Sequence, residues 1–120
     1  MLYFQTSFLI EPAGKVVLRY RRLVSLFAPS PYDVYDRYVS AYGKDALFPV
    51  ADTELGRMSA IASEEILYPE IARAHAVRGA EVFLHSSSEV SSTLPTPKNI
   101  AKQARAIENQ GVVVQGNTGG

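Results

Sequence analysis

Residues 56–73 constrain the fold most, because they indicate a buried strand that turns directly into a helix. Residues 57–62 are mostly small or apolar, which is typical of a strand whose two faces are both covered. The helix is predicted to begin at Tyr68-Pro69-Glu70, since the first turn is where the missing N–H of proline costs least. It is predicted to run to Arg78 and to stop at Gly79, a favourable C-terminal cap.

Ser63 stands at the junction between this strand and this helix, and Glu64 and Glu65 follow it. A side chain at such a junction is displayed at the end of a sheet, and the backbone N–H groups after it point at incoming negative charge. Ser63 is therefore a candidate nucleophile. Serine needs a paired base, however, and no adjacent histidine is evident, so the alternative is a small polar residue that caps the helix. The two acids could act as base or orienting group, or simply favour the positive end of the helix dipole.

The other predicted elements alternate between strand and helix, which indicates an α/β fold. They are a hairpin of strands 3–10 and 15–20, an aromatic-rich helix at 32–42, a short strand at 47–50, a strand at 81–85, a Ser/Thr/Pro-rich loop at 86–97, a helix at 98–109 and a buried strand at 112–115. In the last helix, Ile100, Ala104 and Ile107 are spaced as a buried stripe. In the first, the tyrosines at 35, 38 and 42 and the valine at 39 share one face. That face either packs on the core or forms a pocket lid or subunit contact.

Length and charge narrow the functional classes. The 120 residues suit one domain, residues 1–120, with one core. Twelve basic and twelve acidic residues balance, so neither nucleic acid nor a membrane surface is the expected partner. With no cysteine, disulfides and thiolate metal sites are excluded. We expect no cofactor and no metal, because His75 and His85 lack ligand spacing and are predicted to be surface or satisfied core residues. The cytoplasm is the default location.

These motifs resemble the nucleophile segment of the nitrilase, or carbon–nitrogen hydrolase, superfamily: a glycine, an apolar strand, the nucleophile position, two acids and an aromatic-Pro-Glu helix. The resemblance continues through residues 79–84, Arg-Ala-Ile-Glu-Asn at 105–109 and the valines at 112–114, to Asn117. It covers most of this chain but only the middle part of a typical family member. It implies part of a four-layer α-β-β-α sandwich, in which Glu108 and Asn109 are structural.

The resemblance also implies a chemistry, from which this chain departs. The family hydrolyses non-peptide carbon–nitrogen bonds in amides, nitriles and N-carbamoyl compounds, with a cysteine nucleophile, a lysine and a glutamate. Ser63 stands at the cysteine position and Arg22 at the lysine position, while Glu64 would contribute its backbone N–H to the oxyanion site. Arginine keeps the positive charge but does not give up a proton. The family's first glutamate lies upstream of the hairpin and is not among these residues.

Two functions are therefore considered. In the first, the chain is a hydrolase relative acting on a small amide or nitrile, in which Ser63 attacks while Arg22 and the Glu64 N–H stabilise the oxyanion; its activity would be impaired or lost. In the second, it is a non-catalytic homologue that binds or assembles, which the absent cysteine and lysine favour. We expect self-association, as in the family.

Two expectations concern the ends of the chain. Uncovered sheet edges and an uncovered apolar face would suit a fragment or an incomplete product, unless a partner chain covers them. Residues 2–5, Leu-Tyr-Phe-Gln, resemble part of an engineered protease site. We favour a native strand for residues 1–7, because it fits the family pattern just before the hairpin. The arginines at the end of the hairpin, at 19, 21 and 22, could bind a carboxylate or phosphate. For Arg19 and Arg21, a solvated strand end is the preferred expectation.

Overall fold

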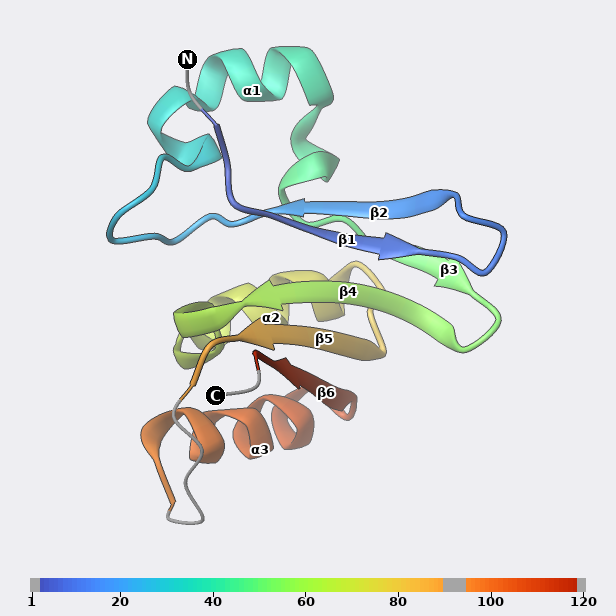
Figure 1. The fold of residues 1–120 in the computed structure, drawn as a ribbon, viewed down its shortest axis with the longest axis vertical. Helices are drawn as coiled ribbons and strands as arrows, with labels where there is room; N and C mark the ends of the chain where they lie inside the picture. The colour runs from blue at the N-terminus through green and yellow to red at the C-terminus, as the bar shows by residue number, and fades with distance from the viewer. Residues whose placement is uncertain (1–2, 90–94, 119–120) are drawn as a thin grey trace.

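A computed structural model describes residues 3–89 and 95–118 of the chain. Figure 1 shows the order of the elements, with the N-terminal hairpin and first helix above and the remaining strands and helices below. The elements are β1 (Thr6–Ile10), β2 (Val16–Arg21), the 3₁₀ turn η1 (Pro31–Val34), α1 (Tyr35–Tyr42), η2 (Lys44–Leu47), β3 (Ala51–Thr53), β4 (Gly56–Ala62), η3 (Ser63–Leu67), α2 (Pro69–Val77), β5 (Val82–Ser87), α3 (Pro97–Asn109) and β6 (Val112–Asn117).

Within the described residues, the strands form two sheets. β1 and β2 make the predicted antiparallel hairpin, in which Thr6 pairs with Arg21 and Leu9 with Leu18. The second sheet has the order β3-β4-β5-β6. β3 is antiparallel to β4, whereas β4, β5 and β6 run parallel and are joined through α2 and α3. The predicted α/β alternation is confirmed.

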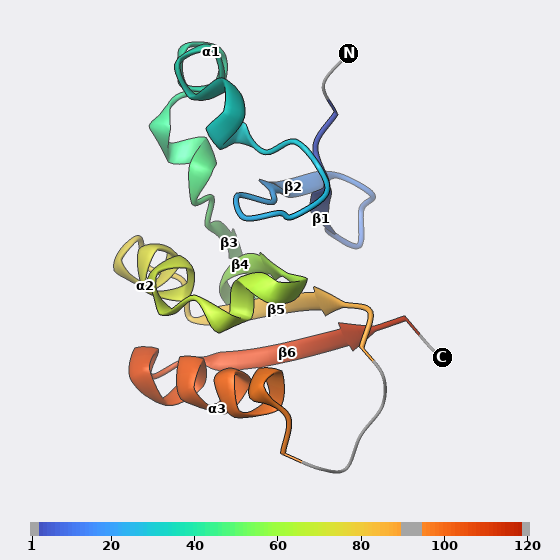
Figure 2. The ribbon, with the colours of Figure 1, turned by 90° about the vertical axis from the view of Figure 1, so that its left-hand side faces the viewer.

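Two hydrophobic clusters lie on opposite faces of β4, because successive side chains of a strand point to opposite sides. Ile61 packs with residues of α2, α3 and β5, including Ala72, Ala101 and Phe83. Its neighbour Ala60 packs against the hairpin. Figures 1 and 2 agree that the hairpin lies between α1 and the four-stranded sheet. The end of β4 is therefore covered on both faces.

The predicted C-terminal cap of α2 is confirmed. The helix ends at Val77, and Gly79 adopts a φ of +102° while its N–H donates to the Ala76 carbonyl at 2.9 Å. A Cβ on this residue would lie 2.7 Å from Nη1 of Arg57. The flexible end of the Arg57 side chain can move aside, so the left-handed backbone conformation is what favours glycine here.

Several predicted boundaries are wrong. Residues 47–50 do not form a strand: η2 ends at Leu47, and the strand β3 begins at Ala51. Residues 63–67 form a 3₁₀ turn that the sequence pattern did not predict. β5 continues to Ser87, into the predicted loop, of which residues 90–94 lie outside the described residues. Short elements of this kind are set by tertiary contacts more than by propensity.

Two predictions of burial are also wrong. Ile100 and Ile107 are 56% and 77% exposed, and the buried residues of α3 are Ala101 and Arg105. In β6, Val112 and Val114 are 57% and 49% exposed, and only Val113 of these three valines packs against the core. The apolar spacing identified the helix and the strand correctly. Nothing in the described part of the chain covers the faces that carry these residues.

The tyrosine face of α1 is only partly a core face. Tyr38 is buried, whereas Tyr42 is 56% exposed. The Arg21 guanidinium lies 4.4 Å from the centre of the Tyr42 ring and 5.5 Å from that of Tyr38, and donates to the Tyr38 hydroxyl at 3.1 Å. Such cation–π contacts tie α1 to the end of the hairpin. Arg21 is therefore not the solvated residue that was expected.

His75 of α2 lies in the core, fully buried against the edges of the Tyr20 and Phe48 rings. No hydrogen bond of ordinary geometry reaches either ring nitrogen from the described residues, although the Pro49 carbonyl lies close enough to affect the ring. His75 is therefore neither the surface residue nor the fully satisfied core residue that was predicted. Burial lowers the pKa of His75 from 6.5 to about 4, and the Pro49 carbonyl offsets only part of this effect. The folded protein therefore keeps this imidazole neutral.

Lowering the pH should destabilise the protein through His75. The folded pKa lies below the unfolded one, so this contribution is fully present above pH 6.5 and is lost as the pH falls toward 4. We expect the free energy of unfolding of the wild type to fall across this window by about 3 kcal/mol more than that of His75→Leu. Urea denaturation at several pH values measures the difference. Equal pH slopes in the two proteins would contradict the assignment.

Candidate active site

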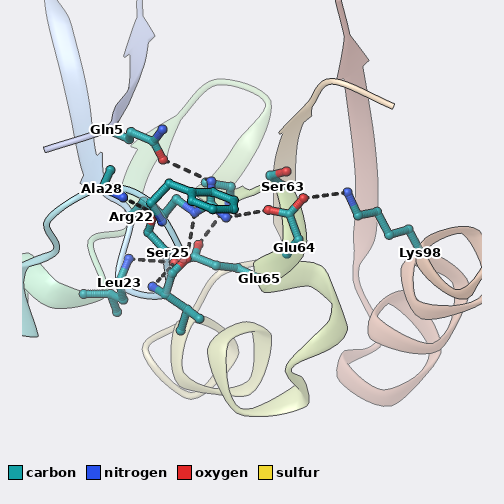
Figure 3. A network of polar contacts seen from close by, with 12 residues as sticks. Gln5, Arg22, Leu23, Ser25, Ala28, Ser63, Glu64, Glu65 and Lys98 are labelled. Carbon is teal, nitrogen blue, oxygen red and sulfur yellow. Dashed lines mark hydrogen bonds and ion pairs between the residues drawn. The ribbon is translucent and has the colours of Figure 1, made fainter. Parts of the chain in front are cut away.

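Ser63 sits where β4 ends and η3 begins, at the carboxyl end of the parallel strands (Figure 3). Its φ is +49°, a left-handed conformation that is uncommon for residues other than glycine. Strained backbone of this kind occurs at functional sites, and the crevice outside the carboxyl ends of parallel strands is the usual ligand position in open α/β sheets. The structure thus places the candidate nucleophile where the sequence predicted.

His85 on β5 faces the backbone of Ser63, 2.9 Å from its carbonyl oxygen. Because a carbonyl only accepts hydrogen bonds, Nε2 of His85 must carry the proton and donate it. Burial lowers the pKa of His85, and the Ser63 carbonyl partly opposes that shift. His85 thus holds the strained turn as a neutral donor, with Nε2 engaged by the carbonyl of Ser63.

Glu64, Arg22 and Lys98 form one ion-pair cluster beside Ser63. Nη2 of Arg22 lies 2.5 Å from Oε2 of Glu64, and Nζ of Lys98 lies 3.0 Å from Oε1. Figure 3 shows the Glu64 side chain between the two cations. The three residues come from the end of the hairpin, the start of η3 and the first turn of α3. The sequence predicted a role for Arg22 and for the Glu64 N–H, but it gave no signal for Lys98.

The pKa of Glu64 is lowered to about 2, chiefly by the hydrogen bond from Lys98. The backbone N–H of Glu64 itself lowers it further, and burial opposes the shift. The Ser63 hydroxyl and Arg22 make smaller contributions that also lower it. The carboxylate is therefore ionised at ordinary pH. It engages the Arg22 guanidinium, one of the groups that were predicted to stabilise an oxyanion.

Glu65 is fully buried and accepts four hydrogen bonds. Oε1 receives the backbone N–H groups of Leu23 and Val24 at 2.6 and 2.9 Å, and Oε2 receives the Tyr20 hydroxyl and the Ala62 N–H at 2.6 and 3.1 Å. Burial, followed by the charge and hydrogen bond of Glu65, raises the pKa of Tyr20 well above its usual value. Glu65 therefore joins the hairpin to the strand that carries Ser63. Sequence reasoning considered only base, orienting and helix-dipole roles for this acid and missed this one.

The described residues form a pocket away from Ser63, but neither a metal site nor a membrane-spanning helix. A groove of about 970 Å³ lies between the two hairpin turns, at the opposite end of β4, and its lining includes Pro12, Leu55 and Met58. In residues 3–89 and 95–118, no cluster of three or more His, Cys, Asp or Glu side chains could hold a metal ion. None of the helices in that part of the chain has the length and apolar character needed to cross a membrane.

Replacing Glu65 with glutamine should destabilise the whole domain. The amide nitrogen cannot accept, so at least one buried donor loses its partner; we expect a loss of about 3 kcal/mol of unfolding free energy. Urea denaturation measures it, with Glu81→Gln as control. Because the Glu81 carboxylate is exposed, that substitution should stay within about 0.5 kcal/mol of wild type. A loss at Glu65 no larger than the control would show that the four bonds do not stabilise the fold.

Comparisons with known proteins place this geometry in a family. The carbon-nitrogen hydrolase family model matches residues 2–118. A deaminated glutathione amidase of Yersinia enterocolitica is 28% identical over 91% of this chain and 38% of its own length. A hydrolase of Schizosaccharomyces pombe is 24% identical over 89% of this chain and 33% of its own length. The chain thus spans 33% to 38% of the length of these curated relatives.

A solved structure shows the same fold. A nitrilase-superfamily member from Saccharomyces cerevisiae matches with a TM-score of 0.68 at 21% identity, over 95% of this chain and 38% of that one. The predicted resemblance is therefore confirmed. The family match over nearly the whole chain, together with this fold, shows that the chain belongs to the carbon–nitrogen hydrolase family of the nitrilase superfamily.

Proposed function

We propose that this protein is a non-catalytic homologue of the carbon–nitrogen hydrolases, which uses the site beside Ser63 to bind a small molecule rather than to hydrolyse it. One observation carries the proposal. The carboxylate of Glu64 lies against Arg22 and Lys98, where the oxyanion of a family reaction would need positive charge. A site whose positive groups already hold an anion offers little stabilisation to a developing one.

The residues around Ser63 support this reading. The chain has no cysteine, and a serine hydroxyl is a weak nucleophile unless a base takes its proton. His85 is directed at the Ser63 carbonyl, and Lys98 is bound to Glu64. Glu65 accepts four hydrogen bonds from other groups. These nearby candidates for a base are therefore engaged elsewhere.

A second candidate function is hydrolysis of a small amide or nitrile, and the φ of +49° at Ser63 favours it. In that reaction, the Ser63 hydroxyl would lose its proton to a base and attack the carbon, while Arg22 and the Glu64 N–H stabilised the oxyanion. With an amide, the amine or ammonia would leave after protonation. A nitrile would first form an imidate and take up one water before ammonia leaves. In both cases, a further water would then release the acid from the acyl-enzyme. Glu64 would first have to move away from Arg22.

Hydrolysis assays separate the two functions. We expect the wild-type gene product to release ammonia from a panel of small amides and nitriles at the background rate. Hydrolysis that disappears in Ser63→Ala would overturn the proposal. The double change Ser63→Cys with Arg22→Lys then tests the site itself. Recovered activity would show that only the reacting groups had been lost, and continued inactivity would show a remodelled site.

We also propose that the complete domain is the four-layer α-β-β-α sandwich and that the protein self-associates. The first proposal is supported by the order of the layers. Helices α2 and α3 are followed by the four-stranded sheet, then the hairpin, then α1 (Figures 1 and 2). The exposed valines at 112 and 114 support the second, because Val113 packs on the helix side and its neighbours therefore point to the opposite face. An uncovered apolar face on an edge strand favours association.

Self-association should depend on this face. We expect the molar mass from light scattering to exceed that of one chain in the wild type and to fall toward it in Val112→Lys/Val114→Lys, because lysine on an edge strand opposes pairing. Val77→Lys is the control, since Val77 is also exposed but lies on α2. Equal masses for the wild type and the β6 variant would show that this face is not the interface.

A further inference from the structure

The ion-pair cluster beside Ser63 has the form of an occupied carboxylate site. Each oxygen of the Glu64 carboxylate faces its own cation, Oε1 with Lys98 and Oε2 with Arg22. The two cations come from elements far apart in the sequence, and they converge on a single group (Figure 3). Charge-assisted hydrogen bonds to both oxygens are how proteins recognise a carboxylate.

Arg22 is held in place independently of Glu64. Its Nε donates to the Val24 carbonyl at 2.7 Å and its Nη1 to Oε1 of Gln5 at 3.0 Å. The side chains of Arg22 and Lys98 are 13% and 21% exposed, whereas that of Glu64 is 44% exposed. The cations are thus largely covered, and the anion lies on the solvent side. A site already arranged in this way binds a ligand with little further ordering.

The position of Lys98 argues for a role outside its own helix. It lies in the first turn of α3, where the helix dipole disfavours a positive charge, and that turn carries no acidic residue. The cluster of Arg22, Lys98 and Glu64 keeps one net positive charge. The neighbouring Glu65 carboxylate is taken up by its own four donors and pairs with neither cation. An anion remains the favoured occupant.

We propose that Arg22 and Lys98 form a binding site for the carboxylate of a small-molecule ligand, and that Glu64 occupies this site until the ligand displaces it. The inference rests on the proposed function, in which the protein binds a ligand beside Ser63, and it names the ligand class. A neutral amide or nitrile cannot replace a charge held between two cations. A carboxylic acid can, and it is the product that hydrolysis of an amide or nitrile releases.

Displacement, rather than protonation, opens the site. The pKa of Glu64 is lowered to about 2, so this carboxylate stays charged at ordinary pH. A ligand carboxylate therefore competes with an ionised side chain that is tethered beside it. Removing the charge of Glu64 while keeping its size should expose the competition directly.

Calorimetric titration of the native gene product with propionate, and with propionamide as the uncharged counterpart, tests the proposal. We expect Glu64→Gln to bind propionate about tenfold more tightly than the wild type, the change expected from two partly covered ion pairs. Adding Lys98→Met to Glu64→Gln should remove this binding. Propionamide should show no such dependence on the variants.

Glu108→Gln is the matched control. The Glu108 carboxylate also pairs with an arginine, Arg105, at 2.6 Å, and it is 42% exposed, close to the 44% of Glu64. This substitution should leave propionate binding at the wild-type level. A general effect of removing one negative charge would instead strengthen binding in both variants and would overturn the proposal.

Two further results would overturn the proposal: equal propionate affinity in the wild type and Glu64→Gln, or phosphate binding as tightly as propionate. Circular dichroism checks that the variants fold. Should Glu64→Gln not fold, thermal unfolding of the wild type and Lys98→Met gives the test, since propionate should raise the melting temperature of the wild type alone. Ammonia release from propionamide is measured separately. Hydrolysis of propionamide would overturn the proposed function. Equal propionate binding by the wild type and Glu64→Gln would overturn only the carboxylate site.

Discussion

The buried carboxylate of Glu65 is the interaction on which the geometry of the site depends. Two of its four donors are backbone N–H groups just after the hairpin, and a third belongs to the last residue of β4. Arg22 directly precedes Leu23, the first of the two donors after the hairpin, and Ser63 directly follows Ala62, the donor at the end of β4. A charge in the core is stable only when it is fully paired, so these segments have little freedom to move apart. The relative position of Arg22 and Ser63 is thus held by a buried side chain that hydrogen-bonds to the segments on which they lie.

Around this anchor, two cations converge on one carboxylate beside Ser63. Arg22 and Lys98 share the carboxylate of Glu64. The arginine is compatible with that arrangement, since its planar guanidinium matches a carboxylate and stays charged. The strained backbone at Ser63 is nevertheless present. The family geometry and the occupied cationic site therefore coexist in one turn of chain.

The elements that could be predicted from the sequence are those with strong local signals. Proline at the start and glycine after the end identified α2, and apolar runs with turn residues identified the hairpin and β4 to β6. The short strand β3 was misplaced, and the buried faces of α3 and β6 were assigned wrongly. Spacing shows that Ile100 and Ile107 share a helix face, but not whether another element covers that face. In the site, Ser63, Arg22 and Glu64 were found through motif positions, whereas Lys98, His85 and the role of Glu65 were not.

The sequence by itself therefore determined the family, the order of most elements and the candidate site residues, because local propensities and motif spacing can be read from neighbouring positions of the chain. Only the tertiary structure decided which groups those residues meet. Lys98 and Glu64 are separated by 34 positions, and Arg22 and Glu64 by 42. Pairs this far apart leave no periodic signal in a single sequence, because packing alone brings them together. For the same reason, the buried ring of His75 and the exposed valines of β6 became visible only in the folded chain.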